Sequence, residues 1–226
     1  EMEEIRAYGL PQPVAVIPNG IHIPDEPVAP KAGVSRQRYV LYLGRLHPKK
    51  ALDRLIGAWA LVASEFPEYV LKIVGPAEDR YDDILRETAA RLGLSSVEIS
   101  DAVYGADKEE LLFGADLFAI SSLNENFGNS VSESLAHGVP VITTKGTPWA
   151  GVVAESCGWW VDHGVEPMAA ALREALSLPR HVRRSMGRKG RAWMSRSYGW
   201  ERVAWNMRQV YVWLAGEGER PSCVSL

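Results

Sequence analysis

The sequence is poor in cysteine and lacks the motifs of the common metal sites. Only two of its 226 residues are cysteines, Cys157 and Cys223, and neither these nor the five histidines have metal-ligand spacing. There is also no Asp-x-Asp pair, the usual means of holding a diphosphate through a divalent ion. The sequence therefore predicts neither a metal ion nor a disulfide framework, and it favours a reducing compartment, the cytoplasm.

Three motifs of nucleotide and nucleophile sites are missing as well. No G-x-G-x-x-G follows a predicted strand, which argues against a dinucleotide cofactor, and no G-x-x-x-x-G-K-[ST] marks a P-loop NTPase. The G-x-S-x-G nucleophile elbow is also absent. We therefore expect no cofactor.

The sequence has no long hydrophobic run. No stretch of about eighteen apolar residues predicts a membrane span, and the acidic start EMEEIRAYGL lacks the apolar core of a signal peptide. The chain does not begin like a natural start, because a sequence pattern is already under way at Glu1. This indicates a piece cut from a longer chain. With 46% hydrophobic and 23% charged residues and a net charge of −3, the composition is typical of a soluble globular protein.

Positive charge is concentrated near the C-terminus. Between Arg180 and Arg208 there are nine lysines and arginines and a single acid, Glu201. One interpretation is the solvated face of a helix whose apolar side is packed. The alternatives are contact with a partner domain or with an anionic surface, at the inner face of the membrane. Nucleic acid is not expected, because no binding motif accompanies the charge.

Short apolar runs alternate with stretches of helical periodicity, which predicts an α/β fold. Buried strands are predicted at 39–44, 69–75, 97–100, 116–122 and 138–144, and helices at 51–64, 82–92 and 108–113. About six such alternations imply a Rossmann-like, doubly wound and mostly parallel sheet. After Glu166 the strands stop, and helices are predicted at 166–177, 180–196 and 200–215, followed by a frayed tail at 216–226.

Polar and glycine-containing segments follow four of the predicted strands. They are Gly44-Arg45, Gly75-Pro76, residues 121–128 and residues 145–148. The carboxyl ends of parallel strands share one edge of the sheet, and that edge is where doubly wound folds bind ligands. We therefore expect the functional site there.

The segment NENFGNSVSESLAHGVPVITT places two carboxylates, Glu125 and Glu133, eight residues apart around a glycine. Gly128 lets backbone approach a ligand, and a helix should start near Asn129 or Ser130. The free N–H groups at that start, with the positive end of the helix dipole, form an anion site. Glu125 would then lie in the loop, and Glu133 one turn inside the helix, with acceptors suited to two vicinal hydroxyls.

Each of these polar residues also has an ordinary structural interpretation. Ser130 and Glu133 have the spacing of a capping box, which would make Glu133 an N3 cap. Glu125 could be a solvated loop acid, and Asn126 and Asn129 could be turn residues. The residues alone leave these alternatives open.

The turn GRLHPKK places Arg45 and Lys50 on either side of a proline. Lys50 lies near the start of the next helix, where a cation opposes the helix dipole. We therefore expect Lys50 to interact with a negatively charged group. A guanidinium and a flexible ammonium together suit a diphosphate. The alternative is a surface turn with ordinary charges. His47 has no obvious partner in the sequence, and it is expected to be a loop residue.

The quoted segments resemble the C-terminal half of the family-4 retaining glycosyltransferases of the GT-B fold. The likeness is carried by YLGRLHPKKALDRLI, the Glu125-x7-Glu133 block, IPNGI at 17–21 and GVPVITTKGTPW. The segment YGWERVAWNMRQVYVWL is similar to the closing helix of such enzymes. The likeness covers nearly the whole chain. Ala51 departs from it, because many relatives carry glycine after the lysine.

The resemblance implies roles for the candidate residues. Arg45 and Lys50 hold the donor diphosphate and stabilise it as it leaves, whereas Glu133 binds the ribose hydroxyls. Glu125 is either a nucleophile or only a sugar ligand, since retention could equally arise by attack on the face that the diphosphate leaves. The implied catalytic residues are Arg45, Lys50 and Glu125. The implied donor-binding residues are Gly44, Asn126, Phe127, Gly128, Asn129, Ser130 and Glu133.

The resemblance further implies a metal-independent transferase that moves a sugar from a nucleoside diphosphate sugar to a glycan or lipid-linked acceptor. Among such donors, the resemblance favours a UDP-sugar. Residues 1–22 would lead in from a missing N-terminal domain, residues 23–178 would bind the nucleotide-sugar, and residues 179–215 would pack back or cross to that domain. Helix 200–214, with Trp205 and Trp213, should expose an apolar face to it. One alternative is a non-catalytic nucleotide-binding module. A phosphorylase-like enzyme would need a pyridoxal-binding lysine, whose signature is not evident.

Overall fold

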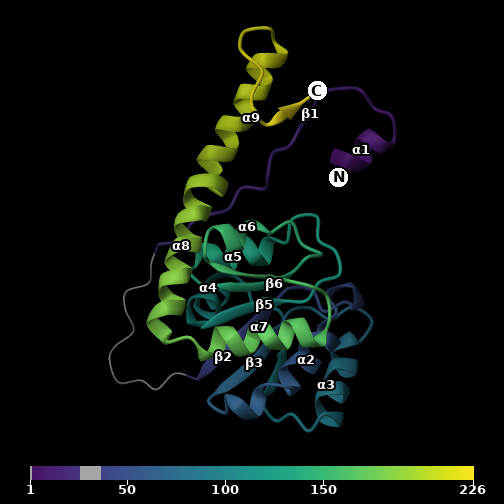
Figure 1. Ribbon diagram of the computed structural model, residues 1–226, viewed down its shortest axis with the longest axis vertical. Coiled ribbons are helices and arrows are strands. Elements are labelled where there is room, and N and C mark those ends of the chain that lie inside the picture. Colours follow the sequence, from purple (N-terminus) through teal and green to yellow (C-terminus); the bar gives the residue numbers. More distant parts are fainter. Residues whose placement is uncertain (1, 26–36) are drawn as a thin grey trace.

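The computed structural model describes residues 2–25 and 37–226 (Figure 1). Its centre is a parallel sheet of six strands in the order β4-β3-β2-β5-β6-β7. The strands are β2 (Arg38–Leu43), β3 (Tyr69–Val74), β4 (Val97–Ser100), β5 (Leu117–Ile120), β6 (Val141–Thr144) and β7 (Gly158–Val161). The order reverses between β2 and β5, where doubly wound sheets form a crevice for ligands. The predicted fold class is confirmed.

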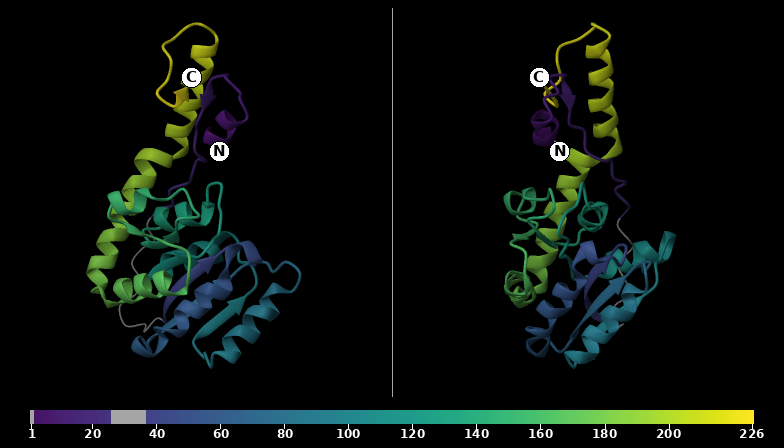
Figure 2. Two further views of the ribbon diagram at one scale, coloured as in Figure 1. Left: turned by 45° about the vertical axis from the view of Figure 1, so that its right-hand side comes forward. Right: turned by 90° about the vertical axis from the view of Figure 1, so that its right-hand side faces the viewer.

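Helices cover both faces of this sheet (Figure 2). On one face α2 (Leu52–Ala60) packs against α3 (Tyr81–Arg91) and α7 (Val165–Ser177). On the other, α5 (Asn129–Ala136) packs against α8 (Arg180–Tyr198). The connections also carry α4 (Gly105–Gly114), α6 (Gly151–Ala154) and the 3-10 turns η1 (Pro48–Lys50) and η2 (Ala63–Glu65). The fully buried core includes Leu41, Leu71 and Phe118 of the sheet and Trp59 of α2.

The sheet contains one strand that the sequence pattern did not predict. β7 has the sequence GWWV, and all four of its residues are half-buried. Among the described strands it pairs with β6 alone, at the edge of the sheet. An edge strand with this exposure has neither the continuous apolar run of a buried strand nor a clear alternation, so periodicity gives no signal for it.

At the end of the molecule away from the sheet, the C-terminal segment lies beside α9 (Trp200–Leu214), which follows α8 after Gly199 (Figure 1). This end also holds α1 (Met2–Ala7), β1 (Val14–Ala15) and β8 (Val224–Ser225). Strands β1 and β8 are antiparallel, and the Val16 N–H donates to the Cys223 carbonyl at 2.9 Å. The prediction of a frayed tail is therefore wrong for these residues, because the tail finds a strand partner more than 200 residues away in sequence.

Several arginines of the basic C-terminal stretch are used inside the fold. Arg183 is 2% exposed, and its guanidinium donates to the Ala175 carbonyl at 3.0 Å and to the Tyr69 hydroxyl at 2.6 Å. Arg191 donates to the Ala136 carbonyl at 2.7 Å, which ties α8 to the end of α5. A solvated basic face is therefore only part of the explanation of this charge, since these groups bind backbone carbonyls.

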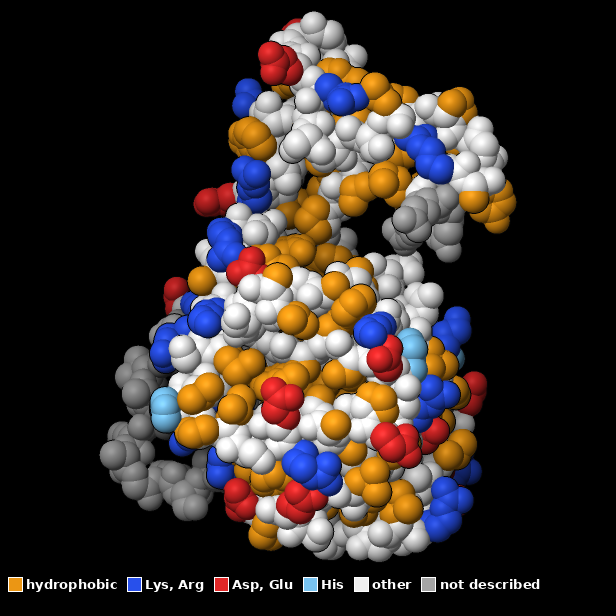
Figure 3. Space-filling view, viewed as in Figure 1, with side chains coloured by type: hydrophobic (Ala, Val, Ile, Leu, Met, Phe, Trp, Pro, Cys, Tyr) orange, Lys and Arg blue, Asp and Glu red, His pale blue; other side chains and the backbone are white. Residues whose placement is uncertain are grey.

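Helix α9 exposes apolar side chains, as the resemblance implied. Trp200, Trp205, Tyr211 and Leu214 are each at least half exposed, whereas Val203 and Val210 are buried. Trp213 is half-buried, so it contributes less to this surface than expected. Hydrophobic side chains reach the surface over this end of the molecule (Figure 3). Among the described residues, no helix is both long and apolar enough to cross a membrane.

Candidate functional site

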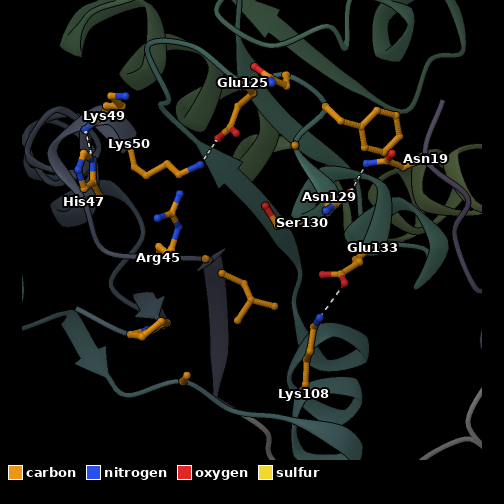
Figure 4. A pocket seen from close by; sticks show the side chains of 18 of the residues that line it. Asn19, Arg45, His47, Lys49, Lys50, Lys108, Glu125, Asn129, Ser130 and Glu133 are labelled. Atoms are coloured by element: carbon orange, nitrogen blue, oxygen red, sulfur yellow. Dashed lines mark hydrogen bonds and ion pairs between the residues drawn. The ribbon is translucent and has the colours of Figure 1, made fainter. Parts of the chain in front are cut away.

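A cavity of about 770 Å³ opens at the carboxyl edge of the sheet (Figure 4). Its walls come from the segments that follow β2, β3, β4 and β5 and from the first turns of α5. This is the edge on which the sequence placed the site, and every residue to which the resemblance gave a catalytic or donor-binding role lines the cavity. The lining residues are Asn19, Leu43, Gly44, Arg45, His47, Lys49, Lys50, Gly75, Pro76, Ala102, Val103, Tyr104, Lys108, residues 124–130 and Glu133.

The floor of the cavity is formed where two strand ends come very close. A Cβ atom on Gly75, after β3, would lie 1.8 Å from the Gly44 carbonyl oxygen, after β2. Only glycine permits this approach. The buried Tyr42 hydroxyl donates to the Arg45 carbonyl at 2.9 Å. Burial, and then the nearby Glu125 charge, raises the pKa of Tyr42 well above its usual range, so this hydroxyl keeps its proton and holds the turn.

The turn after β2 is shaped by His47 and Ala51. His47 precedes η1, and its Nδ1 accepts a hydrogen bond from the Lys49 N–H at 3.0 Å. His47 is a loop residue, as predicted, and its partner, which the sequence did not indicate, is the first turn of η1, which it caps. Ala51 has a φ of 49°, in the left-handed region that favours glycine. The turn thus requires a left-handed backbone conformation at position 51, which glycine adopts more easily than the alanine found in this chain.

Arg45 and Lys50 of this turn each contact a carboxylate. The Lys50 Nζ lies 2.5 Å from Glu125 Oε1, and the Ser122 hydroxyl donates to the same oxygen at 2.7 Å. The Arg45 guanidinium lies 2.6 Å from Glu78 Oε1, but its side chain is 66% exposed. Lys50 and Glu125 are far less exposed, at 18% and 12%. The first pair is therefore fixed inside the wall, whereas Arg45 can turn toward a ligand.

The loop that carries Glu125 is held from two sides. The Ser121 hydroxyl donates to the Lys50 and Ala51 carbonyls, each at 2.9 Å, which links the end of β5 to the turn after β2. The Glu125 N–H donates to the Gly146 carbonyl at 2.8 Å. The segment 145–148 was expected at the ligand edge, and it does follow β6, but it does not line the cavity. Its contribution is to support the Glu125 loop from behind.

Phe127 and Gly128 place the start of α5. Phe127 packs on the Trp149 and Tyr198 rings, at centroid distances of 5.1 and 6.0 Å, and the Trp149 Nε1 donates to the Phe127 carbonyl at 2.5 Å. Gly128 is the N-cap, with a φ of 79°, and makes no side-chain cap. The first N–H groups of a helix have no partner within it. Those of Asn129 and Ser130 consequently face the cavity with the positive end of the helix dipole.

The structure excludes the capping-box interpretation of Glu133. Because α5 starts at Asn129, Ser130 is already inside the helix and cannot be the N-cap of a capping box. Glu133 instead contacts Lys108 of α4, with 2.7 Å between Nζ and Oε1. Its side chain is 26% exposed and lines the cavity. Glu133 thus offers a carboxylate to the cavity, with one oxygen held by a lysine.

The polar residues of the cavity wall that were not among the candidates include Asn19, His47, Lys49 and Lys108. The Asn19 side-chain amide donates to Asn129 Oδ1 at 3.2 Å, which brings the IPNGI segment over the start of α5. Lys108 could have been considered, because its helix follows β4 at the same sheet edge. Asn19 has no such local signal. Over residues 2–25 and 37–226, no group of three or more histidine, cysteine, aspartate or glutamate side chains has the arrangement of a metal site.

Comparison with known proteins identifies similar sequences and folds. The family model described as "Glycosyl transferases group 1" matches residues 27–193. The chain is 32% identical over 207 residues to the D-inositol 3-phosphate glycosyltransferase of Segniliparus rotundus, a match that covers 86% of this chain and 45% of that protein. The chain thus spans about half the length of the curated relatives that it matches.

Two solved structures share the fold. Sucrose-phosphate synthase from Thermosynechococcus elongatus superposes with a TM-score of 0.76 at 23% identity, over 89% of this chain and 53% of that one. Anabaena Alr3699/HepE in complex with UDP and glucose superposes with a TM-score of 0.68 at 23% identity, over 80% of this chain and 49% of that one. At this identity the likeness concerns the fold alone.

Proposed function

This chain belongs to the group 1 glycosyl transferases, and we propose that it is the donor-binding half of a retaining, metal-independent enzyme. Its Rossmann-like sheet with C-terminal helices is one half of the GT-B fold. The proposed donor is a nucleoside diphosphate sugar, with UDP as the nucleotide, since a structure of similar fold is a complex with UDP and glucose. The proposed acceptor is a glycan or a lipid-linked acceptor. A second domain would hold it, and the matched relatives are long enough to contain such a domain.

One observation carries this proposal. Two acids lie at different ends of a single cavity, with the start of α5 between them (Figure 4). Each acid is paired with a lysine from another element, Glu125 with Lys50 and Glu133 with Lys108. A nucleotide-sugar presents hydroxyl groups at both ends and a diphosphate in the middle. The cavity presents carboxylate acceptors at both ends and N–H groups in the middle, so the two patterns match.

In this proposal the departing diphosphate is stabilised without a metal ion. The Lys50 ammonium and the free N–H groups of α5 line the middle of the cavity, and Arg45 can leave Glu78 to join them. Fixed positive groups aimed at a developing negative charge stabilise the transition state more than the ground state. The Lys50–Glu125 pair lies where the phosphate meets the sugar. Lys50 would act on the leaving group there, and Glu125 on the sugar.

At the other end, Glu133 would accept hydrogen bonds from the ribose hydroxyls. The Lys108 ammonium, 2.7 Å from Oε1, fixes the rotamer of the carboxylate. Oε2 then remains available, and Oε1 keeps a second lone pair for a hydroxyl group. Lys108 therefore acts on the ligand through Glu133.

We expect UDP to bind this chain equally well in magnesium and in EDTA. The physical reason is that the positive groups of the chain itself would neutralise the diphosphate. Isothermal titration of UDP, ADP and GDP in both buffers measures this and also selects the base. Binding that requires magnesium would contradict the metal-free site. Failure of all three nucleotides in both buffers would contradict the proposed function.

The two acids should have separable effects on binding. Glu133→Gln is expected to weaken UDP by about 1.5–3 kcal/mol, because the ribose hydroxyls lose a charged acceptor. The loss should become smaller when 2′-deoxy-UDP or 3′-deoxy-UDP replaces UDP, because each of these nucleotides lacks one of the two hydroxyl groups. Glu125→Gln should leave UDP nearly unchanged and weaken only the intact sugar donor. Equal losses for ribose and deoxyribose nucleotides would show that Glu133 does not contact the ribose.

A further inference from the structure

The loop that follows β3, residues 75–80, is bonded to the turn that follows β2. The Leu46 N–H donates to the Pro76 carbonyl at 2.8 Å, and the Glu78 N–H donates to the Leu46 carbonyl at 3.1 Å, so the two segments form a short parallel bridge. The Glu78 carbonyl accepts from the Tyr81 N–H at 2.9 Å. Both polar groups of the Glu78 backbone are therefore bonded, and the residue has a fixed place beside the turn.

The loop keeps an unfavourable backbone conformation directly after Glu78. Asp79 and Arg80 have φ values of 50° and 58°, in the left-handed region. That region is disfavoured for residues other than glycine, although aspartate tolerates it better than most. Such residues persist where the surrounding structure holds them, and they are concentrated at functional sites. Two in succession indicate a function for this loop, and the contacts of Glu78 indicate which function.

The Glu78 carboxylate contacts a residue of the cavity at the carboxyl edge of the sheet, which we call the donor cavity. Its Oε1 lies 2.6 Å from Arg45 Nη1. Arg45 lines the donor cavity (Figure 4), whereas Glu78 does not. Carboxylate and phosphate oxygens are the same kind of acceptor for a guanidinium group. Glu78 therefore occupies, from outside the cavity, a donor of Arg45 that a diphosphate would use.

His47 offers Glu78 a second partner. The Glu78 Oε2 lies 3.7 Å from His47 Nε2. Because His47 Nδ1 accepts from the Lys49 N–H, Nε2 carries the proton in the neutral ring. That N–H can come within hydrogen-bond distance of the carboxylate once Arg45 has moved away. Release of Arg45 thus leaves Glu78 with a donor, which makes the exchange less unfavourable.

We propose that Glu78 is a positioning residue of the donor site, which holds Arg45 at the edge of the cavity until a diphosphate replaces the carboxylate. This inference rests on the proposed function. The Arg45 side chain is 66% exposed, so it can turn without breaking packed contacts. Lys50 is fixed in the wall beside Glu125. One cation of the site is thus preset, and the other becomes available in exchange for Glu78.

The test is isothermal titration of UDP into the whole chain and its folded variants at constant ionic strength. Glu78→Gln is expected to bind UDP about two- to fivefold more tightly than the unchanged chain, because an exposed ion pair of ordinary strength no longer has to be broken. A merely structural role would not give a gain in affinity. Uridine has no phosphate group, so it should bind to both equally.

Asp79→Asn is the matched control. It removes one negative charge from the same loop, at a residue that does not line the donor cavity, and asparagine tolerates the left-handed backbone. This variant should bind UDP like the unchanged chain. The NMR signal of the Arg45 Nε–H, assigned with Arg45→Ala, gives a second readout. Without ligand, it should move in Glu78→Gln and stay in place in Asp79→Asn.

The Arg45→Ala background separates two causes of a gain. If Glu78 acts through Arg45, Glu78→Gln should have no effect on UDP binding in that background. A gain of the same size would overturn the proposal, since the loss of a negative charge alone would then explain it.

Three results would overturn this proposal and leave the donor site standing. They are unchanged binding of UDP by Glu78→Gln, weaker binding by this variant, and an Arg45 signal that Glu78→Gln does not move. Weaker binding would mean that Glu78 orients Arg45 for the ligand and does not compete with it. Absence of UDP binding in the unchanged chain would instead contradict the proposed function, and this inference with it.

Discussion

Lys50→Ala is expected to weaken binding of UDP by about 1.5–3 kcal/mol, or roughly 10–150-fold, the scale of a hydrogen bond to a charged group. The ammonium lies in the wall of the donor cavity at only 18% exposure, so water screens it less than a surface lysine. Its removal also leaves Glu125 without its ion-pair partner, 2.5 Å away, and adds an uncompensated negative charge where the diphosphate should lie.

The measurement is isothermal titration of the folded variant, with Lys72→Ala as the matched control. Lys72 forms a 3.2 Å ion pair with Glu98 between β3 and β4 and does not line the cavity. Arg45→Ala should produce a loss in the same range, although Arg45 must first leave Glu78. If Lys50→Ala binds UDP as tightly as Lys72→Ala does, Lys50 is not a diphosphate ligand and the Lys50–Glu125 pair is only structural.

The fold was predictable because the central strands are buried on both faces. β2, β5 and β6 are almost wholly buried, so their sequences are continuous apolar runs that periodicity detects. The half-buried β7 carries no such run. β8 was not predictable for another reason, since its two residues become a strand only by pairing with Val14 and Ala15. Because these partners are more than 200 residues apart in sequence, the local sequence pattern gives no signal for the pairing.

The candidate site was predictable to the extent that topology brings strand ends together. Gly44, Arg45 and the 124–130 segment each follow a predicted strand, and the parallel sheet places them at one edge. The pairing within the site was not predictable. The sequence allowed Glu133 to be a cap of Ser130, and only the start of α5 at Asn129 excludes that. Lys108 and Asn19 reach Glu133 and Asn129 from other elements, so their partners are determined by tertiary packing.

The 226 residues are expected to bind the sugar donor and yet transfer no sugar above background. Glycosyl transfer requires an acceptor hydroxyl held against the sugar, and alignment of two reactants supplies much of the rate of such a reaction. The donor cavity is open, and its described walls come from one Rossmann-like half. The matched relatives are about twice as long, which leaves room for a second half that would hold the acceptor and exclude water.

The exposed face of α9 agrees with that expectation. Trp200, Met207, Tyr211 and Leu214 recur at helical spacing on one side, and each is more than a third exposed. Apolar surface of this kind is usually covered by a partner. The assay is transfer from the donor selected by titration to a mixed panel of glycan and lipid-linked acceptors, with donor binding measured on the same sample. Robust turnover would place the acceptor site within these residues. It would also leave the α9 surface without the role in domain contact that its exposure suggests.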